Sequence, residues 1–202
     1  MPEIRDDLSS PVGPGRWQVL HDGSLIQFVV RHLVVHRVRG RFGSFDGTIT
    51  TGDSILDATV EGWVESKSVD TRDRARDNYI RSADVFDCER WPRIHLRGRI
   101  AGRSRRGFLL RSELTILGSA HAVEWDVELH DAGSNGTGTM RLSAAAVVSR
   151  KTLGLRWNPL LDTGGAIVGD DVGLTLEIRA RRVDPASTGE RDVRSEPSAH
   201  HP

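Results

Sequence analysis

The stretch LDATVEGWVES, from Leu56 to Ser66, alternates between two kinds of residue over almost its whole length. Every second residue from Leu56 to Val64 is apolar or small, and the residues between them are polar apart from Trp63. Successive side chains of a β-strand point to opposite faces of the sheet, so this alternation is typical of a strand with one buried face. We therefore predict a half-buried strand here.

The same alternation returns along the chain and predicts about eight strands in all. It is clear in IHLRGRI (94–100), VEWDVEL (123–129) and VGLTLEIRAR (172–181), and weaker in SLIQFVV (24–30), SFDGTIT (44–50), GFLLRSELTIL (107–117) and TMRLSAAAVV (139–148). Short turns between such strands favour an antiparallel arrangement, because parallel strands need crossover helices and are apolar on both faces. A single apolar face must then be buried against itself, in a barrel or a two-sheet sandwich.

One segment between the predicted strands has the features of a helix. In VDTRDRARDNYIRSADVF (69–86), Asp70 or Thr71 can cap the first turn, and a short apolar stripe follows. We expect a short inserted helical segment at about residues 71–87. The ends of the chain are rich in proline, serine and charge, which predicts a flexible tail at 1–14, one barrel domain at 15–183 and a disordered tail at 184–202.

Composition narrows the class of protein. The chain has 202 residues, is 37% hydrophobic and carries a formal net charge of zero, so no global field marks it as a nucleic-acid-binding protein. Its one cysteine, Cys88, cannot form an internal disulfide, and we expect a buried, inert thiol in a reducing compartment. The absence of an apolar signal-like or membrane-spanning stretch leads us to expect a cytoplasmic protein.

Two histidines, His32 and His36, raise the question of a metal site. On a helix they would share a face, but the residues around them favour an extended chain, in which they would lie about 13 Å apart along one strand. Two ligands of one zinc ion must lie within a few Å of each other. We expect structural hydrogen bonding in a turn or short helix at 32–36, with metal binding or acid/base chemistry as weaker alternatives, and predict no metal site.

The inward face of the predicted barrel bears on function. It carries large apolar residues but also small ones, Gly47, Gly62, Gly98, Ala144 and Ala146, which would leave space. An eight-stranded barrel is at the size where the interior is either filled or holds one small ligand, and glycines can also mark bends or tight packing. The alternation predicts an apolar cavity for an apolar ligand, lined by Ile26, Phe28, Val30, Phe45, Val60, Val64, Ile94, Leu96, Leu110, Leu114, Trp125, Leu142 and Leu176.

Several longer motifs resemble a known family in their order along the chain. They are GRWQVLHDGSLIQFVVRHLVVHRVRGRFGSFDGTIT (15–50), SVDTRDRARDNYIRSADVFDCERWPRIHLRGRI (68–100), ELTILGSAHAVEWDVEL (113–129) and VVSRKTLGLRWNPLLDTGGAIVGDDVGLTLEI (147–178). Together they resemble the YceI-like family of polyisoprenoid-binding, lipocalin-like proteins. The resemblance implies an all-β, eight-stranded antiparallel barrel with an inserted helical segment, holding a polyisoprenoid or isoprenoid quinone in an apolar channel. It implies no catalytic residues and no cofactor.

The resulting expectation is a non-enzymatic protein that sequesters or transports an apolar lipid, with a role in quinone storage or stress responses. Two alternatives stay open at this point: an enzyme or sensor that acts on a small apolar molecule in the same cavity, and a packed barrel that works through an arginine-rich surface. Five arginines crowd one predicted hairpin and could make transient contact with a membrane surface: Arg97, Arg99, Arg103, Arg105 and Arg106. The oligomeric state is left open, with a homodimer among the options.

Overall fold

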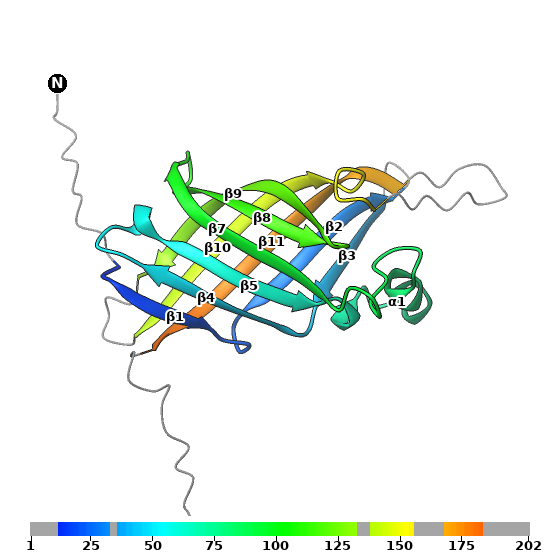
Figure 1. Cartoon of the computed structure of the whole chain (residues 1–202), viewed down its shortest axis with the longest axis horizontal. Coiled ribbons are helices and arrows are strands. Elements are labelled where there is room, and N and C mark those ends of the chain that lie inside the picture. Colours follow the sequence, from blue (N-terminus) through cyan, green and yellow to red (C-terminus); the bar gives the residue numbers. More distant parts are fainter. Residues whose placement is uncertain (1–11, 33–35, 133–137, 156–167, 184–202) are drawn as a thin grey trace, which may run out of the picture.

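The computed structural model describes residues 12–32, 36–132, 138–155 and 168–183 (Figure 1). These residues form eleven strands, one α-helix and two short 3-10 helices. The strands are β1 (Gly15–Val19), β2 (Leu25–His32), β3 (His36–Phe42), β4 (Phe45–Thr51), β5 (Thr59–Glu65), β6 (Val69–Asp70), β7 (Arg93–Arg103), β8 (Phe108–Ile116), β9 (Ser119–Asp131), β10 (Thr139–Ser149) and β11 (Val168–Val183). The helices are η1 (Ile55–Asp57), η2 (Ser66–Ser68) and α1 (Arg74–Arg81). No helix in these ranges is long and apolar enough to cross a membrane.

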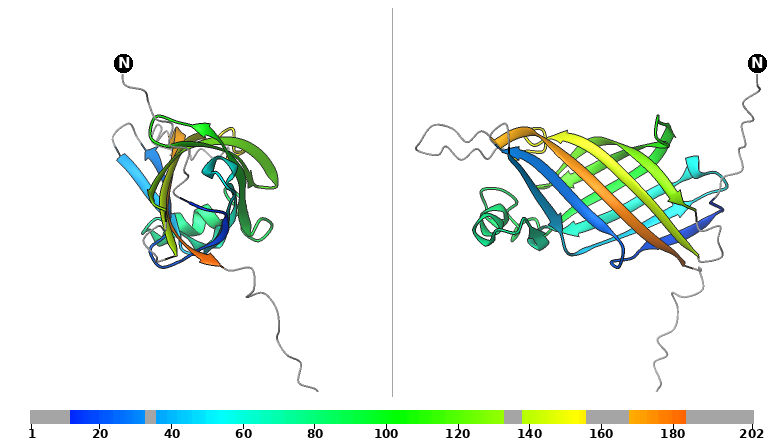
Figure 2. Two further views of the ribbon diagram at one scale, coloured as in Figure 1. Left: turned by 90° about the vertical axis from the view of Figure 1, so that its left-hand side faces the viewer. Right: turned by 180° about the vertical axis from the view of Figure 1, so that it is seen from behind.

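Eight of the strands close into an antiparallel barrel, which confirms the predicted fold. Hydrogen-bonded neighbours follow the order β1-β4-β5-β7-β8-β9-β10-β11, and β11 pairs back with β1. The end-on view shows the strands arranged in a ring (Figure 2, left). Each strand turns its apolar face inward, so that the barrel buries the single apolar face that the alternation predicts.

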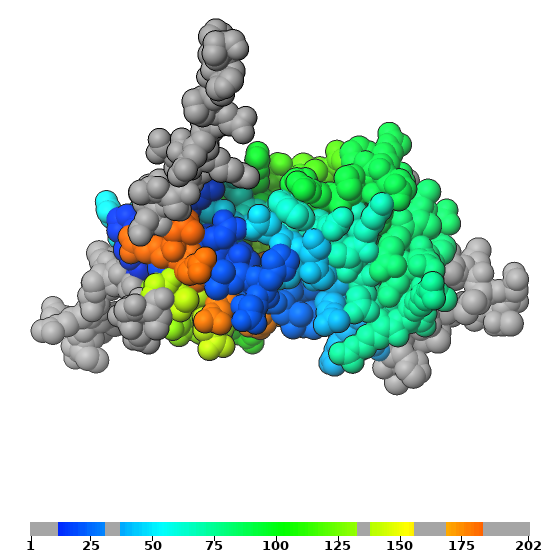
Figure 3. Space-filling model, turned by 90° about the horizontal axis from the view of Figure 1, so that it is seen from below, coloured from blue at the N-terminus to red at the C-terminus, as the bar shows by residue number. Residues whose placement is uncertain are grey.

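The long strand β11 closes the ring by pairing with two strands along one edge. Its carboxyl end pairs with β1, with Arg16 opposite Val183, while its amino half pairs with β2, with Phe28 opposite Leu174. Figure 3 shows β1 in blue beside the end of β11 in orange. The predicted strand at 24–30 therefore forms as β2, which continues the barrel wall beyond β1 along β11, while β1 takes the position beside β4.

The inserted helical segment lies at one end of the barrel (Figure 1). The carboxylate of Asp73 caps α1 by accepting a hydrogen bond from the backbone N–H of Arg76 at 3.0 Å. The turns that follow α1 bring Val85 and Phe86 into a buried cluster with Phe42, whose ring centre lies 6.2 Å from that of Phe86. The prediction of a short helical segment at about 71–87 is thus confirmed, with the helix itself confined to Arg74–Arg81.

A second buried cluster fills the opposite end of the barrel. Trp17 and Met140 pack there with Val12, which falls within the predicted amino-terminal tail although its side chain is only 1% exposed. The indole N–H of Trp17 donates to the hydroxyl of Thr51 at 3.1 Å, and that hydroxyl donates to the carbonyl of Gly13. Within the described residues, packed structure therefore begins at Val12. The rest of the predicted tails, 1–11 and 184–202, lies outside the described residues.

The histidine pair does not lie along one strand. His32 ends β2, His36 begins β3, and the two are direct partners in the ladder of this hairpin. The expected turn or short helix at 32–36 is wrong at its ends, because β-pairing extends to both histidines. Residues 33–35 lie outside the described part of the chain.

Candidate functional site

A cavity of about 300 Å³ lies inside the barrel, between the clusters that fill its two ends. Its wall is almost entirely apolar. The middle of the wall is a third cluster, built on Trp125, Leu110, Val127 and Ala144. Ligand sites in proteins are commonly concave, mostly apolar and of this size or larger, so the cavity is the candidate functional site.

All of the thirteen residues predicted from the alternation lie in the wall of this cavity. They are Ile26, Phe28 and Val30 from β2, Phe45 from β4, Val60 and Val64 from β5, Ile94 and Leu96 from β7, Leu110 and Leu114 from β8, Trp125 from β9, Leu142 from β10 and Leu176 from β11. The period-two pattern places them because residues at every second position of a strand share one face. That they contact a ligand stays a prediction.

Part of the wall comes from residues that the alternation did not single out. Val85 and Phe86 follow α1, and Leu153 follows β10, so each lies outside a strand. The alternation gives no information about such positions. The apolar side chains at the end of the helical segment were the available signal, because a short amphipathic insertion needs an apolar surface to cover.

Two of the small inward residues do not open space as expected. Gly47, Gly62 and Ala144 line the cavity, whereas Gly98 and Ala146 do not. A Cβ atom at Gly98 would lie 2.7 Å from the carbonyl oxygen of Arg111, on the neighbouring strand β8. Gly98 thus permits close packing of two strands, which is the other role that a glycine in a strand can have.

The polar groups buried in the barrel are mostly satisfied by the barrel itself. The indole N–H of Trp125 donates to the hydroxyl of Ser112 at 2.8 Å. The one buried guanidinium that borders the cavity, that of Arg150, donates to the carbonyls of Gly169 and Leu155, each at 3.1 Å. Within the described ranges, no group of three or more His, Cys, Asp or Glu side chains is arranged to hold a metal ion. The cavity wall therefore offers almost only apolar contacts to a ligand.

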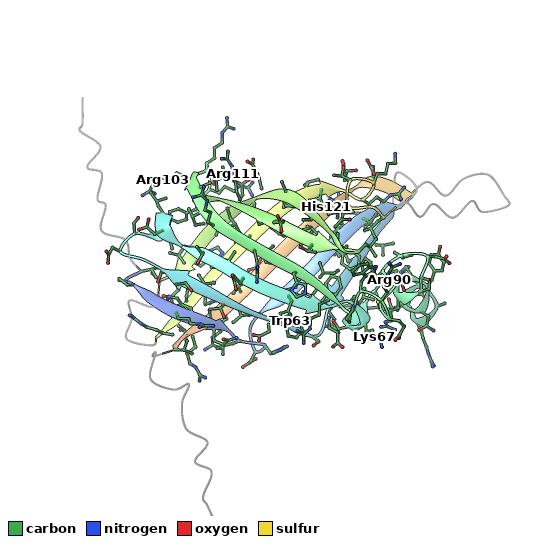
Figure 4. All side chains as sticks on the ribbon, viewed as in Figure 1. Trp63, Lys67, Arg90, Arg103, Arg111 and His121 are labelled. Carbon is green, nitrogen blue, oxygen red and sulfur yellow. The ribbon has the colours of Figure 1, made fainter. Side chains whose placement is uncertain are left out.

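The five arginines of the predicted surface patch lie on β7 and in the β7–β8 turn. Arg97 lies 3.7 Å from the carboxylate of Glu61, and the neighbouring Arg111, on β8, lies 2.9 Å from Glu124. That the patch contacts a membrane surface stays a prediction. Arg103 lies over the ring of Phe108. It is at the end of the barrel away from Lys67 and Arg90 (Figure 4), and Arg105 and Arg106 follow in the same β7–β8 turn.

The cysteine is part of the packing at the barrel end that carries α1. Cys88 is 2% exposed and lies in the cluster with Phe42 and Phe86. Burial raises the pKa of the Cys88 thiol above its ordinary value, which keeps it protonated at neutral pH.

Comparison with known proteins places this barrel in a family. A UPF0312 protein of Staphylococcus aureus strain USA300 is 30% identical over 156 residues, which cover 74% of this chain and 87% of the relative. The solved structure of Burkholderia cenocepacia BcnA superposes with a TM-score of 0.69 at 19% identity, covering 80% of this chain and 98% of that one. A polyisoprenoid binding domain from Saccharophagus degradans gives a TM-score of 0.59 at 13% identity, covering 84% of this chain and 99% of that domain. The family model of the YceI-like domain matches residues 17–180, and the chain therefore belongs to the YceI-like family.

Proposed function

We propose that this protein binds an apolar lipid of the polyisoprenoid or isoprenoid-quinone class in the barrel cavity and sequesters or transfers it without chemical change. The observation that carries the proposal is the cavity of about 300 Å³ with an almost wholly apolar wall. Membership of the YceI-like family and the likeness to a polyisoprenoid binding domain support it. The expectation of a cytoplasmic carrier with a role in stress responses belongs to the same proposal.

The energetics of burial favour such a ligand. Each methylene group moved from water into an apolar site contributes about 0.8 kcal/mol, so about ten buried groups contribute about 8 kcal/mol before ordering costs. That gross gain corresponds to a dissociation constant of about 1 μM. A polar or charged ligand would lose its hydration in this wall without gaining partners, at a cost of several kcal/mol.

The enzyme alternative has less support in the site. Catalysis by acid, base or nucleophile needs at least two positioned polar groups around a reacting atom. Almost all of the exposed wall is apolar, and the guanidinium of Arg150, which borders the cavity, already donates to the carbonyls of Gly169 and Leu155. The structure therefore favours binding over chemistry.

Lipid identification with a matched pair of variants tests the proposal. Ala144 is 3% exposed and lines the cavity, whereas Ala145, its neighbour on β10, is exposed on the outer face. Native mass spectrometry of the gently purified protein, followed by solvent extraction, should find one lipid species on the wild type and on Ala145→Phe. Ala144→Phe should lose most of it, because the new ring fills the cavity.

The same experiment can contradict the proposal. A wild-type protein that carries no lipid, and takes up no added isoprenoid quinone or polyprenol, would point to a barrel that works through its surface. Equal lipid loads on the two phenylalanine variants would show that the lipid binds outside the cavity.

A further inference from the structure

The barrel wall has a seam between β9 and β10. The ladder between these strands runs to the pair Asp126 and Ala145 and stops there, although β9 extends back to Ser119 and β10 extends on to Ser149. Along the same part of β9, the ladder with β8 on its other side is complete, down to the pair of Ile116 and Ser119. The seam lies at the barrel end that carries α1 (Figure 1).

A second cavity, of about 260 Å³, lies in this seam. Its lining includes His121 and Val123, which face inward, and also Ala122 and Glu124, which are exposed on the outer face of the same strand. The cavity lies along the unpaired part of the two strands, and Leu153 borders both it and the main cavity.

One polar atom in the seam has no partner. Nε2 of His121 is buried and makes no hydrogen bond, and it is the only such side-chain atom in the described part of the chain. Buried polar atoms are usually satisfied by protein, water or a ligand. A neutral imidazole with the proton on Nε2 donates one hydrogen bond. The ladder partner of His121 on β8, Leu114, lines the main cavity, so the imidazole lies beside the site proposed for the lipid.

The charges near the seam favour an uncharged group. The hydroxyl of Ser149, at the seam, donates to the carboxylate of Asp170 at 2.9 Å, and the outer rim carries Glu124. Glu124 is paired with Arg111 on the outer surface. A phosphate in the seam would meet the Asp170 carboxylate and only one neutral donor, whereas a carbonyl oxygen needs only one hydrogen-bond donor.

We propose that His121 donates a hydrogen bond from Nε2 to the uncharged carbonyl of a quinone-type end group that lies in the seam between β9 and β10. The apolar tail of the same lipid lies in the main cavity, past Leu153. This inference rests on the proposed function and names the end group that the site selects. It also places that end group in the gap between β9 and β10, beside the main cavity.

Two probes with the same tail separate the end group from the tail. Decylubiquinone carries the carbonyl groups, and decylbenzene carries the same decyl chain on a ring without them. Calorimetric titration should show that His121→Phe weakens decylubiquinone binding by roughly two- to tenfold, the range for one hydrogen bond between neutral groups. Decylbenzene binding should not change. His121→Gln, which restores an N–H donor, should recover most of the loss, and His95→Phe, on the exposed outer face of β7, should bind both probes as the wild type does.

A spectroscopic readout reports the hydrogen bond directly. The carbonyl stretch of bound decylubiquinone should lie at lower frequency in the wild type and in His121→Gln than in His121→Phe, and His121→Leu serves as a second apolar variant if the phenylalanine variant does not fold. Equal weakening of both probes, or an unchanged carbonyl stretch, would overturn the assignment of His121 while the carrier function stands. A wild-type protein that binds neither probe would overturn the assignment together with the proposed function.

Discussion

Replacement of Gly98 by alanine should destabilise the barrel at a position that does not itself line the lipid site. The added Cβ atom would lie 2.7 Å from the carbonyl oxygen of Arg111 and 2.8 Å from Cβ of Ser112, which is closer than real Cβ contacts come. Overpacking of this kind costs about 1–3 kcal/mol. For a chain of this size each kcal/mol lowers the melting temperature by about 2–4 °C, so Gly98→Ala should melt roughly 2–12 °C below the wild type.

A second glycine provides the matched control. A Cβ atom at Gly173, in the middle of β11, would meet the carbonyl oxygen of Val29 at 3.8 Å, an ordinary contact. Gly173→Ala should therefore keep or slightly raise the melting temperature, because alanine reduces the freedom of the unfolded chain by about 0.4–1 kcal/mol. Thermal unfolding followed by circular dichroism measures both. Folded Gly98→Ala should still bind lipid as the wild type does, since Gly98 is not part of the cavity wall.

The opposite pair of results would refute this reasoning. If Gly98 makes room for the ligand, as the sequence alone suggests, Gly98→Ala would melt with the wild type and bind lipid more weakly. Equal melting temperatures for the two alanine variants would show that β7 and β8 can move apart without a loss of stability.

Three further results are expected. Removal of the Ser112 hydroxyl in Ser112→Ala leaves the buried indole N–H of Trp125 unpaired, at about 1–3 kcal/mol, and thermal unfolding should show the loss, whereas an unchanged melting temperature would mean that a water replaces the hydroxyl. Buried Cys88, whose thiol pKa is raised by burial, should react with a thiol reagent only after denaturation, so rapid labelling of the native protein would contradict its placement. The hydroxyl of Ser149 holds the pKa of the Asp170 carboxyl below its ordinary value of 3.8, so this contact should stabilise the fold above that pH and lose its effect as the pH falls further. Acid unfolding of Asp170→Asn, compared with the wild type, tests this pH dependence of stability. Equal loss of stability in the two proteins as the pH falls would contradict the prediction.

The fold and most of the cavity wall follow from local patterns in the sequence. The alternation from Leu56 to Ser66 predicts β5, and its inward residues Val60 and Val64 line the cavity. The residue that breaks the pattern, Trp63, projects from the outer face, where the guanidinium of Arg93 lies 3.9 Å from the centre of its ring. A cation–π contact of this kind at an exposed site contributes about 0.5–1 kcal/mol.

The parts that local patterns did not predict depend on contacts between distant residues. The five residues of β1 take a position in the ring because β4 and β11 flank them, and their own sequence does not carry that information. The close approach at Gly98 depends on the path of β8. The seam depends on where two strands part, which alternation cannot report because β9 and β10 keep their inward and outward faces on both sides of that point.

The double pairing of β11 has a consequence for how the chain is made. The hydroxyl of Ser24 accepts a hydrogen bond from the backbone N–H of Arg179, 155 residues further along the chain. During synthesis, the edges of β1 and β2 that pair with β11 therefore stay unpaired until nearly the whole barrel has been synthesised. Folds dominated by such distant contacts form slowly, and unpaired strand edges promote aggregation in the meantime. A chaperone that shields β1, β2 and β4 during synthesis should raise the yield of this protein more than it raises the yield of a helical protein of equal length.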